Sequence, residues 1–171
     1  MLIKLNKELS KKITSVFENL LSGFCILQMI ALALVVILAV FFRKFGHSFI
    51  WYDEVASVQL AWITYYGAAY CALKRSHLGF NGFVDRLDDN VRKVLIILSE
   101  IIICGFFITI AYAGYKILPM LHEENLISLP SVTISFTQSV IPIGCILFVI
   151  AEILSIQTIW EKETLKEKLQ D

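Results

Sequence analysis

The sequence predicts an all-α integral membrane protein with four transmembrane helices. Of its 171 residues, 57% are hydrophobic and only 18% are charged. A soluble domain of this length would leave much of that apolar surface in water, whereas a bilayer dissolves it. A transmembrane helix requires about 20 apolar residues. The chain contains four stretches of this kind, at about residues 20–42, 55–73, 94–115 and 132–159.

The four stretches differ in their polar residues. The first and second contain no charged residue, the third contains Glu100, and the fourth contains Pro142 and Glu152. Because proline lacks a backbone N–H, we expect a kink at Pro142. The first stretch is too long for the apolar core of a cleaved signal peptide and no small-residue cleavage site follows it, so we expect it to remain as an anchor.

Two further segments, at about residues 1–17 and 79–91, have amphipathic helical patterns. We expect both to form short interfacial helices that lie on the membrane surface and contact lipids. Their apolar residues recur at helical spacing, with charged residues on the other faces. These apolar residues are Leu2, Leu5, Leu9, Ile13 and Val16 in the first segment, and Phe80, Phe83, Val84 and Leu87 in the second.

Lysine and arginine residues predict the orientation of the chain. Twelve of them lie in the N-terminal segment, in the loop between the second and third stretches, and in the C-terminal segment. On the opposite side there are only Arg43, Lys44 and Lys116. Because cytoplasmic loops of membrane proteins carry the excess of positive charge, both termini are predicted to be cytoplasmic.

Several functional classes lack support in the sequence. Basic and acidic residues are equal in number, which does not suit a nucleic-acid-binding protein. Each of the four cysteines falls in a different apolar stretch without metal-ligand spacing, so we interpret them as buried hydrophobic residues. His47, His77 and His122 lie at or beyond the ends of the stretches, which does not suit haem ligation. No catalytic motif is present, so we expect no enzymatic activity, metal or cofactor.

Glu100 and Glu152 are the acidic residues predicted to lie within the membrane, where ionisable groups are functional candidates by default. Both lie toward the cytoplasmic ends of their stretches, where each can reach water or a cationic partner. We favour structural pairing for them. The alternative is a self-contained homodimeric exporter that uses both as ion-coupling residues. A third hypothesis is an assembly factor or a subunit of a redox chain.

The second stretch has the densest group of aromatic, acidic and small residues. Aromatic and acidic residues precede it at the predicted outer interface, where rings favour the headgroup level and carboxylates favour a helix N-terminus. Within it, the Gly67-Ala68-Ala69 run offers a flat face for another helix. We predict a contact with a partner subunit here, and the alternative is that the same residues close the chain's own bundle. The predicted contact residues are Trp62, Tyr66, Gly67 and Tyr70.

The sequence resembles the small membrane subunit of tripartite ATP-independent periplasmic (TRAP) transporters, a bacterial family. The specific resemblance covers about residues 51–93. It is carried by Trp51 and Glu54, Trp62, the Gly67-Ala68 pair, the turn Arg75-Ser76-His77, and Asp85 and Leu87. After His77 the chain has Leu78-Gly79-Phe80, which departs from the pattern of the family.

The resemblance implies a three-part importer in the bacterial inner membrane. A periplasmic solute-binding protein captures a carboxylate-bearing solute, such as a C4-dicarboxylate, a sialic acid or a keto acid. A large multi-spanning permease then moves the solute with a sodium gradient by an elevator-like motion.

In such an importer the small subunit would be a non-catalytic helper that packs against the scaffold of the permease. Residues at the periplasmic rim would contribute to docking of the binding protein, and a basic turn would lie in the cytoplasm. The rim residues are Arg43, Lys44, Trp51, Tyr52, Asp53 and Glu54, and the turn residues are Arg75 and His77.

Overall fold

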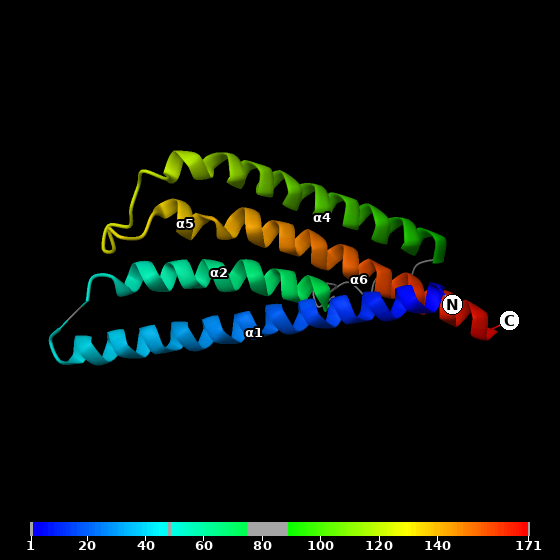
Figure 1. Cartoon of the computed structure of the whole chain (residues 1–171), viewed down its shortest axis with the longest axis horizontal. Helices are drawn as coiled ribbons and strands as arrows, with labels where there is room; N and C mark the ends of the chain where they lie inside the picture. Colours follow the sequence, from blue (N-terminus) through cyan, green and yellow to red (C-terminus); the bar gives the residue numbers. More distant parts are fainter. Residues whose placement is uncertain (1, 48, 75–88, 171) are drawn as a thin grey trace.

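The computed structural model describes residues 2–47, 49–74 and 89–170, most of which are helical. The long helices are α1 (Leu2–Lys44), α2 (Tyr52–Leu73), α4 (Asp89–Ile117) and α6 (Val140–Gln170). Between α4 and α6 lie a short 3-10 helix, η1 (Leu118–Leu121), and the short helix α5 (Ile134–Gln138). Each long helix runs antiparallel to the one before it (Figure 1).

The long helices lie side by side in a layer one helix thick, in the order α1, α2, α6, α4 (Figure 1). The central pair is α2 and α6. Helix α1 packs against α2, and helix α4 packs against α6, so α1 and α4 form opposite edges of the layer. The two ends of the described chain lie at the same end of this layer.

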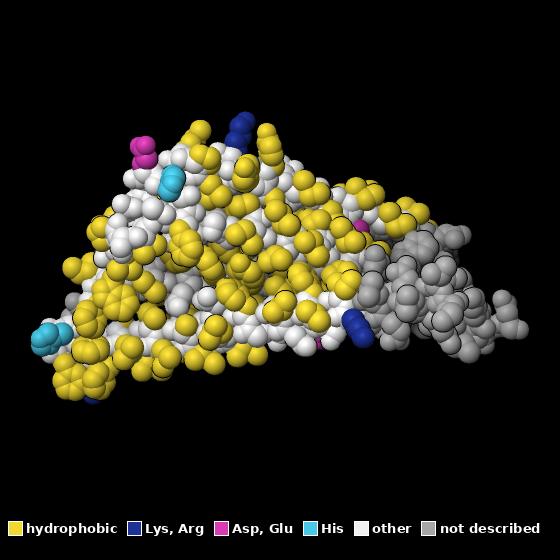
Figure 2. Space-filling model, in the orientation of Figure 1, with side chains coloured by type: hydrophobic (Ala, Val, Ile, Leu, Met, Phe, Trp, Pro, Cys, Tyr) yellow, Lys and Arg dark blue, Asp and Glu magenta, His cyan; other side chains and the backbone are white. Residues whose placement is uncertain are grey.

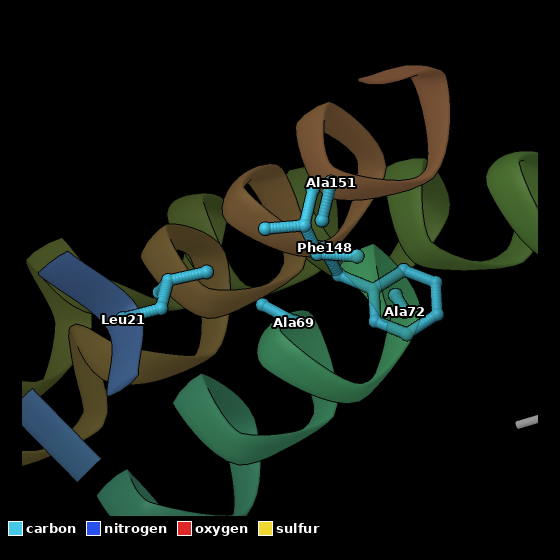
Figure 3. Packing of buried hydrophobic residues seen from close by; sticks show 6 residues of the cluster. Leu21, Ala69, Ala72, Phe148 and Ala151 are labelled. Atoms are coloured by element: carbon cyan, nitrogen blue, oxygen red, sulfur yellow. The ribbon is translucent and has the colours of Figure 1, made fainter. Parts of the chain in front are cut away.

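The buried core lies where α1, α2 and α6 converge (Figure 3). Leu21 of α1 contacts a group of small side chains, including Ala69 of α2 and Ala151 of α6, both of which are fully buried. Small side chains at these positions allow the helix backbones to approach closely. The fourth helix joins this core through Phe107 of α4, which stacks on Phe148 of α6 with ring centroids 3.8 Å apart.

The surface of the layer is largely apolar (Figure 2). Within the described residues, three segments are long and apolar enough to cross a membrane: Lys12–Lys44, Ile97–Leu121 and Ile134–Ile156. The predicted second stretch forms helix α2 but is not among these segments. Its sequence includes Gln59, Thr64 and several tyrosines, which lower its hydropathy. Four membrane crossings therefore remain a prediction.

The structure does not separate the predicted interfacial segment at 1–17 from the first span. Helix α1 continues without interruption from Leu2 to Lys44, because no glycine or proline precedes Gly23 in the sequence. The other predicted interfacial segment covers residues 79–91. Residues 79–88 of it lie outside the described part of the chain. The predicted turn residues Arg75 and His77 also lie outside this part.

The predicted kink at Pro142 is replaced by an interruption one turn earlier. Helix α5 ends at Gln138 and α6 begins at Val140, with Ser139 between them. Pro142 therefore lies in the first turn of α6, where a backbone N–H has no acceptor within the helix. Because proline supplies no N–H to the carbonyl of Gln138, one bond of the helix ladder is missing at this point.

Candidate functional site

Glu54 fixes a loop at the end of the layer opposite the two termini. Its carboxylate, in the first turn of α2, accepts hydrogen bonds from the backbone N–H groups of Ile127 (3.2 Å) and Ser128 (2.9 Å). The Ser128 hydroxyl donates to the carbonyl of Ile50 at 3.3 Å. These bonds attach the loop between η1 and α5 to the N-terminus of α2. Sequence analysis missed this contact, because the two segments are more than 70 residues apart in the chain.

The other predicted rim residues lie at the same end of the layer, but in different surroundings. Arg43 and Lys44 form the last turn of α1 and are exposed, and Asp53 is exposed at the start of α2. Tyr52 and Trp51 are half-buried. The structure therefore gathers the six rim residues at one end, with the Glu54 side chain engaged by backbone groups of the chain itself.

Five aromatic rings form a continuous series across this end. Phe41 contacts Phe42 and Phe45, Phe42 contacts Phe49, and Phe49 contacts Trp51, with ring centroids between 4.8 and 6.0 Å apart. Four of them, together with His47, line an open surface pocket of about 380 Å³. Sequence analysis missed this feature. The repeated phenylalanines at the end of the first stretch were its only signal.

Trp62 connects three helices. Its indole Nε1–H donates to the carbonyl of Thr137 at 3.1 Å, and its ring lies 5.7 Å from that of Phe136, both at α5. On the other side, the Phe24 ring of α1 lies 6.4 Å from the Trp62 ring and 4.4 Å from the Tyr66 ring. Trp62 and Tyr66 thus hold α1, α2 and α5 together within this chain.

The remaining predicted contact residues of α2 differ from each other. Tyr70 packs against the buried core. At Gly67, a Cβ atom would meet nothing within 4 Å. Of the four residues predicted to meet a partner, Gly67 is therefore the one beside open space, and Trp62 and Tyr66 have their principal ring contacts inside the layer.

Helices α2 and α6 approach each other closely at Gly144 of α6. A Cβ atom at this position would lie 2.6 Å from the Cβ of Tyr65 in α2. Only glycine fits this approach without displacing one helix. Sequence analysis did not identify Gly144, because a lone glycine within an apolar stretch has no partner that the sequence reveals.

The structure brings the two intramembrane acids into one neighbourhood between α4 and α6. Glu100 of α4 is buried, and Ser155 of α6 is also buried. Cys104 lies one helical turn after Glu100 on α4, and α4 packs along α6, which carries Glu152. Among the described residues, no group of three or more histidine, cysteine or acidic residues could hold a metal ion.

An ion pair joins α1 and α2 near the termini. The Lys74 ammonium, directly after α2, lies 2.5 Å from the Glu18 carboxylate. This hydrogen bond to Glu18 raises the pKa of Lys74 above its ordinary value of 10.5. Lys74 immediately precedes the predicted cytoplasmic turn, so the pair fixes the end of α2 against α1.

Comparison with known proteins adds one match. The sequence model of a family described as "Tripartite ATP-independent periplasmic transporters, DctQ component" matches residues 32–162, which is more than half of the chain. The matched region starts within α1 and contains α2, α4, α5 and most of α6. A search of curated proteins finds no match to the chain.

Proposed function

Because the chain belongs to the DctQ family, the small membrane component of tripartite ATP-independent periplasmic transporters, we propose that it is a helper subunit that packs against a large permease. The match confirms the resemblance drawn from residues 51–93. In this proposal the permease uses a sodium gradient to import a carboxylate-bearing solute. The small subunit supplies fixed membrane area beside it and performs no chemistry.

The observation that carries this proposal is the layer of helices one helix thick. In the described part of the chain, a small buried core holds the layer together, and large apolar side chains remain exposed on α1, α4 and α6. A subunit that moved a solute alone would need a binding site near the bilayer midplane, usually between repeated halves of the chain. A flat apolar layer is instead suited to lie against the wall of a larger membrane protein.

We further propose that all four long helices cross the membrane with both termini in the cytoplasm. Helix α2 lies along α1 and α6, and its ends carry charged groups: Asp53 and Glu54 at one end, and Lys74 at the other. Backbone carbonyls of the chain accept hydrogen bonds from three of its polar side chains: the Trp62 indole and the hydroxyls of Ser57 and Thr64. A contribution of the rim residues to docking of the binding protein stays a prediction. Among the acidic rim residues, Asp53 is the better candidate, because its side chain is exposed whereas that of Glu54 binds the loop.

The proposal is tested by purification through a C-terminal tag in mild detergent. We expect a large multi-spanning permease to co-purify in stoichiometric amount. Recovery of the chain alone, or as a homodimer, would contradict the helper function. That result would favour the alternative of a homodimeric exporter. This alternative is supported by Glu100 and Glu152, which lie on the neighbouring helices α4 and α6. Their replacement by glutamine should then abolish export.

The predicted contact at Gly67 can be tested in the same experiment. A Gly67→Leu substitution adds volume where the chain itself leaves open space, so the fold should be retained and the permease should be lost. Gly105→Leu is the matched control, because a side chain at Gly105 of α4 also meets nothing within 4 Å. Retention of the permease by the Gly67 variant would show that this face of α2 is not the contact.

A further inference from the structure

The aromatic pocket at the end of α1 is lined by phenylalanines rather than by the tryptophan and tyrosine typical of a membrane-interface anchor. Its lining, which we call the phenylalanine pocket, consists of Phe41, Phe42, Phe45, His47 and Phe49. Phe41 is 55% exposed and Phe45 is 64% exposed. Tryptophan and tyrosine suit the interface because they carry a polar group beside the ring, whereas phenylalanine carries none. Four phenylalanines around a cavity therefore indicate an apolar occupant.

The pocket crosses the predicted boundary of the membrane. The apolar span of α1 ends at Lys44. Phe41 and Phe42 lie within this span, whereas Phe45, His47 and Phe49 lie beyond it. An occupant of the pocket would thus lie where acyl chains join their headgroups.

Two cations lie in the helical turn that contributes to the pocket. Arg43 and Lys44 are exposed in the last turn of α1, next to Phe42 and Phe45 in the sequence. Within the described residues, neither forms an ion pair with an acidic side chain. At the same end, Glu54 is engaged by the backbone of Ile127 and Ser128, and Asp53 is exposed at the start of α2 and forms no ion pair with either cation. The helix dipole favours cations at this terminus, but it does not explain a cavity beside them.

We propose that this end of α1 binds an anionic phospholipid, with an acyl chain in the phenylalanine pocket and the headgroup at Arg43 and Lys44. An apolar pocket beside the last turn of α1, which carries two cations without an ion pair, favours this lipid class over a zwitterionic one. The inference requires only that α1 spans the membrane, and it does not depend on the proposed partnership with a permease.

Trp51 provides a built-in reporter, because its ring lies 5.6 Å from that of Phe49. The purified chain is reconstituted in phosphatidylcholine vesicles that contain increasing fractions of brominated phosphatidylglycerol or brominated phosphatidylcholine. The Trp51 signal is the difference in fluorescence between the chain and its Trp51→Phe variant. We expect brominated phosphatidylglycerol to quench this signal at a lower lipid fraction, by about fivefold for each cation engaged.

Variants separate the headgroup site from the pocket. The double substitution Arg43→Gln, Lys44→Gln should remove the preference for phosphatidylglycerol and leave quenching by brominated phosphatidylcholine. Phe45→Ala should weaken quenching by both lipids. Lys116→Gln is the matched control, since Lys116 is the remaining cation predicted on this side and lies over the Tyr112 ring of α4. This control should keep the preference.

Two results would overturn the proposal. Equal quenching by the two brominated lipids in the unsubstituted chain would mean that the phenylalanine pocket serves only as an aromatic anchor in the membrane. A preference that survives the double substitution would place the anionic lipid elsewhere. Thermal unfolding of each variant in detergent identifies any substitution that disrupts the fold, and Phe45→Leu, which keeps an apolar side chain, then replaces Phe45→Ala.

Discussion

At the residue scale, Glu54 illustrates how a charged side chain at a membrane boundary can serve the fold. A carboxylate has two oxygens, and each accepts one N–H from the loop at Ile127 and Ser128. Hydrogen bonds to a charged acceptor are stronger than those to a neutral one. This single side chain therefore holds a loop that has few other bonds to α2.

We predict that Glu54→Ala lowers the free energy of unfolding by about 1–2 kcal/mol, since it removes both acceptors from a partly exposed loop. Glu54→Gln should have a smaller effect, because one amide oxygen remains as an acceptor. The measurement is thermal or denaturant unfolding of the purified chain in detergent. Asp53→Asn, at an exposed neighbouring position, is the control and should lower stability less than Glu54→Ala, because it removes only the interaction of one charge with the helix N-terminus. Equal stability of Glu54→Ala and the unsubstituted chain would contradict the clamp.

The ion pair of Lys74 and Glu18 predicts a dependence on pH. The pKa of Lys74 is raised in the folded chain above its ordinary value of 10.5, so the pair stabilises the fold fully below about pH 10.5. This stabilisation is lost as pH rises through the pKa of the folded state. Lys74→Met should therefore unfold at a lower temperature than the unsubstituted chain near neutral pH, and the difference should shrink above pH 10.5. A difference that stays constant across this range would argue against the pair.

At the scale of helices, the spacing of α2 and α6 depends on Gly144. Because the nearest atom to a new Cβ would be the Cβ of Tyr65, no rotation of the tyrosine ring can relieve the overlap. We predict that Gly144→Ala lowers the free energy of unfolding by about 1–3 kcal/mol, as for other overpacked sites. Gly67→Ala is the matched control, and should be neutral or raise stability by about 0.5–1 kcal/mol, because alanine favours helix and the space is open. Equal effects of the two substitutions in unfolding experiments would refute this assignment.

The helices themselves could largely be predicted from the sequence. Apolar stretches at 55–73 and 94–115 correspond to α2 and α4 within a few residues, because the length of an apolar run and its charged flanks determine where a helix in lipid begins and ends. The interruption at Ser139 could not be placed from sequence. Proline allows either a kink or a new helix start, and the packing of α5 against Trp62 decides between them.

The functional surfaces could be predicted less well. Trp62 and Gly67 belong to one motif in the sequence, yet one makes contacts within the chain and the other borders open space. In a membrane helix, small and aromatic residues suit contacts within a chain and contacts with a partner equally well. The sequence therefore identifies residues that make helix contacts. The order of the helices in the fold determines which neighbour each of these residues contacts.

At the scale of the whole molecule, the order α1, α2, α6, α4 distinguishes a layer from a closed bundle. Cys25 lies on α1 and Cys71 lies on α2, which pack against each other, whereas Cys104 belongs to the opposite edge helix. We predict that a short bifunctional maleimide joins Cys25 to Cys71 within one chain, in a variant that keeps only these two cysteines.

The matched variant keeps only Cys25 and Cys104, and should take up two separate reagent molecules without an internal crosslink. Intact mass of the monomer separates these outcomes, because an internal crosslink adds one reagent and two modifications add two. An internal crosslink between Cys25 and Cys104 would indicate that α1 and α4 close a bundle.

The single thickness of the layer also has a mechanical consequence. A layer one helix thick resists shear within its own plane, because each helix packs against its neighbours. It bends more easily about axes parallel to the helices. The seams at Gly144 and at the Phe107–Phe148 stack would act as such axes. Bending about these seams would let the layer change its curvature to follow an adjoining surface, while every helix keeps its neighbours and its position along the helix axes.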